Sequence, residues 1–244
     1  MTPAGPIARV TAEVVGCRLC PRLVAWRESV VADPPARYRG ETYWARPVPG
    51  LGDAGARLLV VGLAPAAHGG NRTGRIFTGD RSGDWLFRAL HRAGFANQAL
   101  SKARDDGLEL RDCYIAAVVR CAPPANRPTP AERDTCLPYL VREMRALSRM
   151  RVIVALGAFA WDGALRALGA LGDGWWRIPA PRPKFGHGAE AVIASGDEAQ
   201  RVTLVGCYHP SQQNTFTGKL TEAALDGIFG RARVLADNEV SPPD

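Results

Sequence analysis

Four short aliphatic runs divide this chain of 244 residues into alternating strand-like and helix-like segments. The runs span residues 58–63, 114–119, 151–156 and 201–207, and each precedes a segment whose apolar residues recur at helical spacing. Short runs that are apolar at every position are typical of parallel strands buried on both faces. Strands that alternate with helices in this way form a parallel sheet with helices on both sides. The sequence therefore predicts an α/β fold, a three-layer sandwich with a central four-stranded parallel sheet.

The segments around these runs are assigned to one domain, because a chain of this length can bury one substantial core. Residues 8–31 are expected to form a helix that is broken at a cysteine pair, and residues 33–53 an irregular arm. Three arginines of the first segment are placed on its polar face: Arg18, Arg22 and Arg27. Residues 172–200 predict a surface excursion such as a hairpin. We assign residues 1–236 to the domain and expect residues 237–244 to be a disordered tail.

The charge of the chain favours a polyanionic partner. The formal net charge is +7, and arginine is well suited to phosphate because its fork binds two oxygens. Arginine with frequent Ala and Gly is also typical of a GC-rich genome, so charge alone favours nucleic acid only moderately. The sequence contains no run of about 18 apolar residues and no secretory signal. We therefore expect a cytoplasmic protein without a membrane partner, whose thiols stay reduced.

Six cysteines in such a compartment favour metal binding or packing over disulfides. Cys113 and Cys207 lie inside apolar runs and are expected to be small buried hydrophobic residues. The other four combine a C-x-x-C pair with two single cysteines that flank a proline-rich loop: Cys17, Cys20, Cys121 and Cys136. Four thiolates fit a tetrahedral zinc ion and an iron–sulfur cluster equally well. Free thiols on unrelated elements are the alternative, because a second C-x-x-C is absent from the sequence.

Two polar loops, at residues 64–80 and 208–218, follow the first and the last predicted strands. The carboxyl ends of parallel strands meet at one edge of a sheet, so His209 is expected to face the loop from Gly62 to Asp80. Neither loop has a phosphate-binding, dinucleotide-binding, serine-hydrolase or zinc-deaminase motif. The ordinary interpretation of His209 is a histidine that closes a strand before a proline turn. The functional one is a histidine that hydrogen-bonds an oxygen gaining negative charge during bond cleavage.

The same loops carry a family resemblance. The sequence reads GLAPAAHGGNRTGR at 62–75, FTGD at 77–80, RCAPP at 120–124 and HPS at 209–211, followed by Asn214. In these motifs most of the chain resembles the uracil-DNA glycosylase superfamily and, within it, the fifth family. The resemblance implies an enzyme of base excision repair that flips uracil out of DNA and hydrolyses its bond to C1′ of the deoxyribose. It also implies that the four cysteines of the C-x-x-C set hold a structural [4Fe–4S] cluster.

The resemblance further implies roles for the residues of the site. His209 matches the histidine that lies against O2 of the base and stabilises the departing anion. Phe77 matches the aromatic residue that stacks on the flipped base. The other residues expected to bind the substrate are Gly62, Ala64, Pro65, His68, Ser211 and Asn214.

The residue that holds the hydrolytic water is left open by the resemblance. Relatives in other families carry Asp, Asn or Glu in the first motif, which reads GLAP in this chain and in this respect is like the fifth family. Asn71, His68 and Asp80 are the candidates, and we expect Asn71 and Asp80 to be catalytic together with His209. The alternatives are that Asp80 caps the following helix and that Asn71 holds the backbone of its own loop.

Base specificity is expected to be broad. Ala117 stands where relatives of the fourth family carry an Asn that reads uracil, so we expect excision of hypoxanthine and xanthine too. Neither loop contains a lysine before Lys219, which favours a monofunctional enzyme without lyase activity. The expected partner is double-stranded DNA containing deaminated bases, with single-stranded DNA as an alternative, and the chain is expected to be a monomer. The alternative function is a non-catalytic iron–sulfur protein that binds damaged DNA; a covalent trap for uracil-DNA is least favoured.

Overall fold

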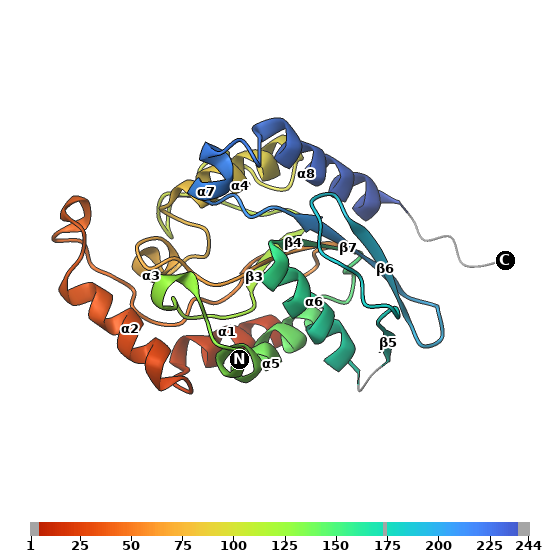
Figure 1. Ribbon diagram of the computed structural model, residues 1–244, viewed down its shortest axis with the longest axis horizontal. Helices are drawn as coiled ribbons and strands as arrows, with labels where there is room; N and C mark the ends of the chain where they lie inside the picture. Colours follow the sequence, from red (N-terminus) through yellow and green to blue (C-terminus); the bar gives the residue numbers. More distant parts are fainter. Residues whose placement is uncertain (1–4, 173–174, 239–244) are drawn as a thin grey trace.

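The computed structural model describes residues 5–172 and 175–238, in which helices and strands alternate along the chain (Figure 1). The helices are α1 (Pro6–Gly16), α2 (Pro21–Ala32), α3 (Gly70–Thr73), α4 (Arg81–Arg92), α5 (Pro130–Ala146), α6 (Ala158–Ala170), α7 (Gln212–Phe216) and α8 (Glu222–Asp237), with short 3-10 turns at Ala36–Tyr38 and Pro124–Asn126. The strands are β1 (Leu51–Gly52), β2 (Leu58–Gly62), β3 (Cys113–Ala117), β4 (Val152–Leu156), β5 (Trp176–Arg177), β6 (Glu190–Ser195) and β7 (Arg201–Cys207). None of the helices described is long and apolar enough to cross a membrane. Residues 239–244, most of the expected tail, lie outside the described residues.

The strands form one sheet in the order β1-β3-β2-β4-β7-β6-β5. The four central strands, β3, β2, β4 and β7, run parallel, which confirms the predicted α/β fold and its parallel core. The whole sheet is larger than the predicted parallel core, because β1, β6 and β5 add antiparallel partners at its two edges. Part of the expected surface excursion at 172–200 supplies β5 and β6. Pairing of β6 with β7 satisfies backbone groups that an edge strand would leave open.

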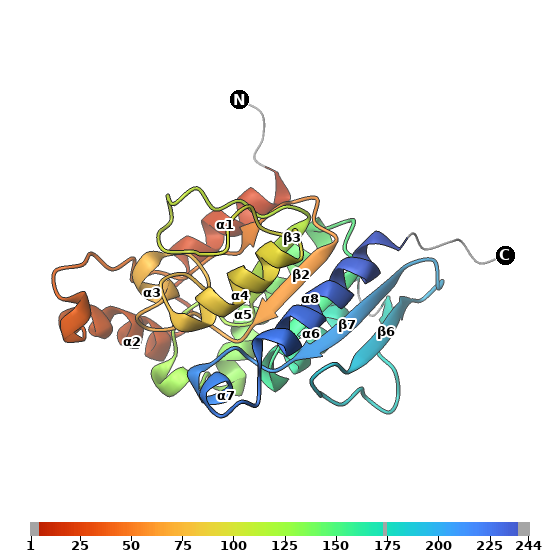
Figure 2. The same ribbon diagram turned by 90° about the horizontal axis from the view of Figure 1, so that it is seen from above.

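Alternate residues of the strands enter two separate cores. In β2, Leu58 and Val60 pack on one side of the sheet and Leu59 and Val61 on the other, and all four are fully buried. Helices α4 and α8 cover the first side, and α5 and α6 cover the second (Figure 2). Helix α1 packs against α5. These contacts make the three layers that the alternation of strand and helix predicts.

The N-terminal segment is broken at the cysteine pair as expected, with α1 ending before it and α2 beginning directly after it. The placement of Arg27 on the polar face is wrong, because only 1% of this residue is exposed. The buried residues of α2 are Leu23, Val24, Arg27 and Val30. Their spacing is that of one helical face, so Arg27 lies within the apolar stripe that contacts the rest of the molecule.

The carboxyl ends of β2, β4 and β7 bring the two predicted loops to one edge of the sheet. The loop after β2 leads into α3 and α4, and the loop after β7 leads into α7. Both views show α7 beside the start of α4, where the guanidinium of Arg81 lies 4.4 Å from the centre of the Phe216 ring. The sheet therefore positions the residues from 62–80 and 208–218 next to one another, as the sequence predicts.

Candidate active site and thiolate site

The side chains of His209 and Phe77 face each other at this edge of the sheet. Their ring centres are 5.9 Å apart, and the rings are tilted by 32°. Removal of the His209 side chain from water lowers its pKa to about 4, so that the ring is neutral near pH 7. A neutral imidazole has one N–H donor and one acceptor nitrogen. The structure thus brings together the aromatic ring and the histidine that the sequence placed in one site.

Contacts to the backbone hold His209 in place. Nδ2 of Asn214 donates to the carbonyl oxygen of His209 at 2.8 Å, and the backbone N–H of Ser211 donates to the same oxygen at 2.8 Å. The Ser211 hydroxyl also accepts the backbone N–H of Asn214 and begins α7. Behind the histidine, a Cβ added to Gly157 at the end of β4 would lie 3.7 Å from the Cβ of His209. Ser211 and Asn214 therefore orient the turn that presents the imidazole.

Phe77 occupies a conformation that most residues avoid. Its φ is 53°, in the left-handed region, where a non-glycine residue costs of order 1 kcal/mol. The ring packs over Gly62 at the end of β2, where an added Cβ would lie 2.9 Å from two ring carbons. The absence of a side chain at Gly62 therefore lets the Phe77 ring lie against the strand end beside His209.

Asp80 forms the helix cap, which was the alternative to a catalytic role. One carboxylate oxygen accepts the backbone N–H of Gly83 at 3.0 Å and begins α4. The second oxygen lies against the backbone of Gly69, where an added Cβ would be 2.0 Å away. Burial raises the pKa of Asp80, and the backbone N–H groups of Gly83 and Ser82 oppose the rise. These contacts show the capping role, and a catalytic role for Asp80 stays a prediction.

His68 lies on the side of the site formed by the arm. Its Nδ1 is 2.9 Å from the hydroxyl of Tyr43, and its ring stacks on Tyr38 with the centres 6.0 Å apart. Its carbonyl oxygen accepts a hydrogen bond from Nε of Arg72 at 2.8 Å. Burial lowers the pKa of His68, and the neighbouring charges of Arg37 and Arg72 add to this effect. The arm therefore holds His68 as a neutral side chain.

Asn71 is fully buried beneath the loop and contacts α2. Its Nδ2 donates to the carbonyl oxygen of Arg27 at 3.2 Å, and its Oδ1 has no partner among the described residues. The alternative considered from the sequence was that Asn71 holds the backbone of its own loop. In the structure its amide holds the backbone of α2 instead. Ala64 and Pro65 belong to the same loop. Ala64 packs against the core under α5 and α6, and Pro65 contacts Gly70.

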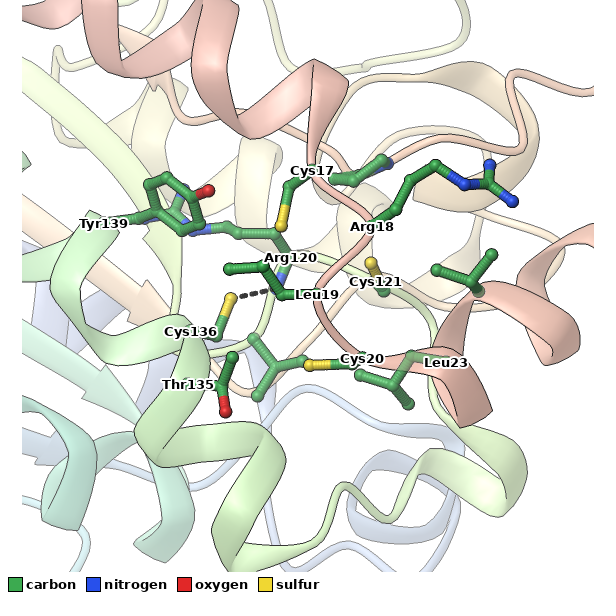
Figure 3. A pocket seen from close by; sticks show the side chains of 13 residues that line it. Cys17, Arg18, Leu19, Cys20, Leu23, Arg120, Cys121, Thr135, Cys136 and Tyr139 are labelled. Carbon is green, nitrogen blue, oxygen red and sulfur yellow. Dashed lines mark hydrogen bonds between the residues drawn. The ribbon is translucent and has the colours of Figure 1, made fainter.

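The four cysteines of the predicted metal site line one pocket (Figure 3). Cys17 and Cys20 come from the turn between α1 and α2, Cys121 follows β3, and Cys136 lies in α5. Burial raises the pKa of Cys121 to about 11 and of Cys136 to about 12, so these thiols keep their protons until a metal displaces them. In the part of the chain that the structure describes, no three metal-binding side chains converge closely enough to hold a metal ion.

The surroundings of the pocket fit a group that carries negative charge. The guanidinium of Arg27 donates to Sγ of Cys121 at 3.0 Å, and the backbone N–H of Arg120 donates to Sγ of Cys136 at 3.3 Å. Nε of Arg27 is buried without a partner among the described residues. Hydrogen bonds to ligand sulfurs are typical of iron–sulfur sites. Cys113 and Cys207 are buried in the core under α4 and α8, which confirms that they pack as small hydrophobic residues.

Several residues at these sites escaped the sequence analysis. Tyr43 lies in an arm without regular structure, and no sequence pattern connects it to His68. Gly157 directly follows a predicted strand, which is a signal that could have placed it at the same edge as His209. Arg27 could have been found from its position in the stripe of α2, since a lone arginine on an apolar face needs a buried partner.

Comparisons with known proteins agree with this geometry. The profile of the Uracil DNA glycosylase superfamily matches residues 49–232. Type-5 uracil-DNA glycosylases of Mycobacterium bovis and Mycobacterium tuberculosis are each 54% identical over 237 residues, which are 97% of this chain and 84% of those proteins. A type-5 uracil-DNA glycosylase of Mycobacterium leprae is 53% identical over 96% of this chain and 97% of that protein. The chain therefore belongs to the uracil-DNA glycosylase superfamily and, within it, to the type-5 family.

Proposed function

We propose that this chain is a monofunctional uracil-DNA glycosylase of base excision repair, which hydrolyses the bond between uracil and C1′ of deoxyribose. The observation that carries the proposal is the neutral, partly buried His209 that faces Phe77 at the carboxyl edge of the sheet. The mycobacterial relatives, which are named uracil-DNA glycosylases, support it. We expect the chain to act in the cytoplasm as a monomer, on double-stranded DNA first and on single-stranded DNA as an alternative.

The two aromatic side chains suit the charge changes of the reaction. Cleavage of the glycosidic bond leaves positive charge on the sugar and negative charge on the departing base. A donor fixed against the oxygen that becomes negative lowers the barrier by about 3 kcal/mol, and His209 is the donor that we assign to O2 of uracil. Stacking of the base on Phe77 contributes about 1–3 kcal/mol to binding. The neutral state of His209 lets the ring donate without first having to gain a proton.

We assign Asp80 and Asn71 as the residues that hold the hydrolytic water. Oδ1 of Asn71 is buried without a partner among the described residues, and the second carboxylate oxygen of Asp80 lies against the backbone of Gly69. The raised pKa of Asp80 brings this carboxyl closer to the range in which a general base accepts a proton. Gly62, Ala64, Pro65 and His68 are assigned to the walls around the base.

Single-turnover cleavage of a duplex with one uracil tests the function. The native chain is expected to form an abasic site, and His209→Ala to slow this step about 100- to 1000-fold. His91→Ala is the matched control, because His91 lies at the end of α4 with Nδ1 on the carbonyl oxygen of Ala96, outside the site. The single-turnover rates of Asp80→Ala and Asn71→Ala show which of the two residues holds the hydrolytic water. Tight binding of uracil-containing DNA without product would favour the alternative of a non-catalytic damage-binding protein.

The site also supports a broad range of deaminated bases. Ala117 at the end of β3 is fully buried and pairs in register with Gly62 of β2, so its methyl group stands at the strand end nearest the site. A methyl group cannot form the paired hydrogen bonds by which an amide selects one base. We therefore expect cleavage of hypoxanthine and xanthine as well as uracil, measured opposite each normal base in double- and single-stranded DNA. Strict rejection of every base except uracil would contradict this breadth.

We also propose that Cys17, Cys20, Cys121 and Cys136 hold a [4Fe–4S] cluster. When bound, such a cluster would link the turn before α2, the segment after β3 and helix α5, while the residues above carry the hydrolysis. Anaerobically purified protein is expected to be brown and to contain iron and acid-labile sulfide. Cys121→Ser is expected to lose both, and Cys113→Ala, which alters a cysteine of the core, to keep them. A colourless protein that contains zinc would overturn the assignment.

A further inference from the structure

Arg27 carries a buried positive charge that no buried carboxylate balances. Its side chain is 2% exposed, and the one carboxylate within 4.0 Å among the described residues belongs to Glu28, whose side chain is 43% exposed. Arg120, the other fully buried arginine beside the thiols, forms an ion pair with Glu143, which is equally buried. A buried ion without a partner is strongly destabilising. The position of Arg27 therefore requires a negative charge that no buried carboxylate among the described residues supplies.

The contacts of Arg27 connect the two sites. Its guanidinium donates to Sγ of Cys121 at 3.0 Å and, through both terminal nitrogens, to the carbonyl oxygen of Cys17 at 3.4 Å. Its own carbonyl oxygen accepts Nδ2 of Asn71 at 3.2 Å. One residue thus contacts the turn that carries two thiols, a third thiol, and the loop that carries Phe77 and Asp80.

We propose that Arg27 is a positioning residue that couples the charge of the thiolate site to the active-site loop. The proposal rests on the [4Fe–4S] cluster proposed above. Four thiolates around such a cluster carry net negative charge, which balances the guanidinium and holds α2 in place. The carbonyl oxygen of Arg27 then stays opposite Asn71, so that the amide remains fixed. Loss of the negative charge leaves the guanidinium buried and unbalanced, so that α2 shifts and releases Asn71.

Two properties of the holoprotein follow from this coupling. A cation that donates to a ligand sulfur stabilises the more negative state of a cluster, so Arg27 opposes oxidation of the cluster. The link through Asn71 also limits opening of the loop, because the backbone N–H groups of residues 71–74 donate to carbonyl oxygens of residues 66–70 in the same turn. Cluster lifetime and loop protection are therefore two separate readouts.

The first experiment measures how long the cluster survives. Holoprotein is exposed to air, and the visible absorbance is followed for the native chain, Arg27→Met and Arg27→Lys. Arg27→Met is expected to lose the cluster at least about tenfold faster than the native chain. Arg27→Lys keeps the positive charge but not the planar guanidinium, so its rate of cluster loss is expected to lie between those of the native chain and Arg27→Met. Arg142→Met is the matched control, because Arg142 does not line the thiolate pocket and pairs with exposed Glu13 at 2.7 Å.

The second experiment measures amide hydrogen exchange of residues 66–80 in the loaded proteins. Arg27→Met and Asn71→Leu are both expected to speed exchange there, whereas Asn71→Leu leaves the cluster lifetime at the native value. Asn71→Leu keeps the Arg27 side chain intact, so it still tests the link if Arg27→Met does not fold. Native exchange in Asn71→Leu, or native cluster lifetime and exchange in Arg27→Met, overturns the coupling. Absence of iron from the native protein overturns the cofactor proposal instead, which keeps the two failures distinct.

Discussion

Burial lowers the pKa of both His209 and His68, but the two side chains have different surroundings. His209 and His68 both have a lowered pKa because each is withdrawn from water. His209 faces an aromatic ring and has its backbone fixed by Ser211 and Asn214. His68 is hydrogen-bonded through Nδ1 to Tyr43 and lies in an aromatic cluster of the arm. The His209 ring thus faces Phe77, whereas the His68 ring is engaged by tyrosines of the arm.

The lowered pKa of His209 predicts a pH dependence of stability. The unfolded chain gains a proton at this residue as the pH falls below 6.5, whereas the folded chain gains it only near pH 4. The stability that neutral His209 supplies is therefore complete above pH 6.5 and lost as the pH falls towards 4, by at most about 3 kcal/mol. Urea unfolding of the native chain and His209→Gln between pH 4 and 8 measures this difference. Parallel curves for the two proteins would contradict the assignment.

Close helix contacts fix the segments that follow β3 and precede α5. Gly163 of α6 lies directly on Val118, which follows β3 and whose N–H donates to the carbonyl oxygen of Gly62. A Cβ added to Gly163 would lie 2.3 Å from Cγ2 of Val118. Glu132 of α5 has a similar connecting role, because it completes the helix cap with Thr129 and pairs with Arg22 of α2.

Two glycine-to-alanine substitutions separate the effect of helix propensity on stability from the effect of packing. Gly227 in α8 has open space around an added Cβ, so Gly227→Ala is expected to stabilise the fold by about 1 kcal/mol. Gly163→Ala gains the same propensity but overfills the contact with Val118, so it is expected to destabilise by about 1–3 kcal/mol in total. Thermal unfolding of the two variants beside the native chain gives both values. Equal stabilisation by the two would show that α6 can move away from β3 without cost.

The whole molecule carries positive charge suited to DNA. Its formal net charge is +7, and Arg37 of the arm and Arg104 of the segment between α4 and β3 have no carboxylate partner among the described residues. Arg37 lies 4.7 Å from the centre of the Tyr38 ring, and Arg104 lies 4.4 Å from the centre of the Trp44 ring. These stacked cations lie close to the loop that follows β2, since Trp44 also packs against Gly74.

This charge predicts that DNA binding depends on salt. Each phosphate neutralised by an arginine releases counterions, so the binding constant falls with a slope of about −0.9 per contact on logarithmic axes. We expect the KM for a uracil-containing duplex to rise steeply between about 50 and 200 mM salt, whereas kcat at saturating DNA stays nearly constant. Steady-state kinetics at several salt concentrations measure both. A KM that is insensitive to salt would show that the surface charge does not contact phosphate.

The parallel core and the place of the site were readable from the sequence. The aliphatic runs are buried on both faces of the sheet, and such strands leave a pattern that depends on each run alone. The loops that follow them meet because parallel strands end at the same edge, so His209 and Phe77 could be placed together before the structure. The antiparallel strand β6 was less readable, since it is partly exposed and its pairing with β7 and β5 is set by contacts outside its own sequence.

The sequence by itself determined the residue types: four cysteines with the spacing of a metal site, a glycine-rich loop, and a histidine after the last parallel strand. Only the tertiary structure decided which polar groups are buried and what they contact. It buried Arg27 against Cys121, and it turned Asn71 towards α2 rather than its own loop. The physical reason is that burial and the partners of a side chain depend on segments distant in sequence, whereas strand and helix patterns are set by neighbouring residues.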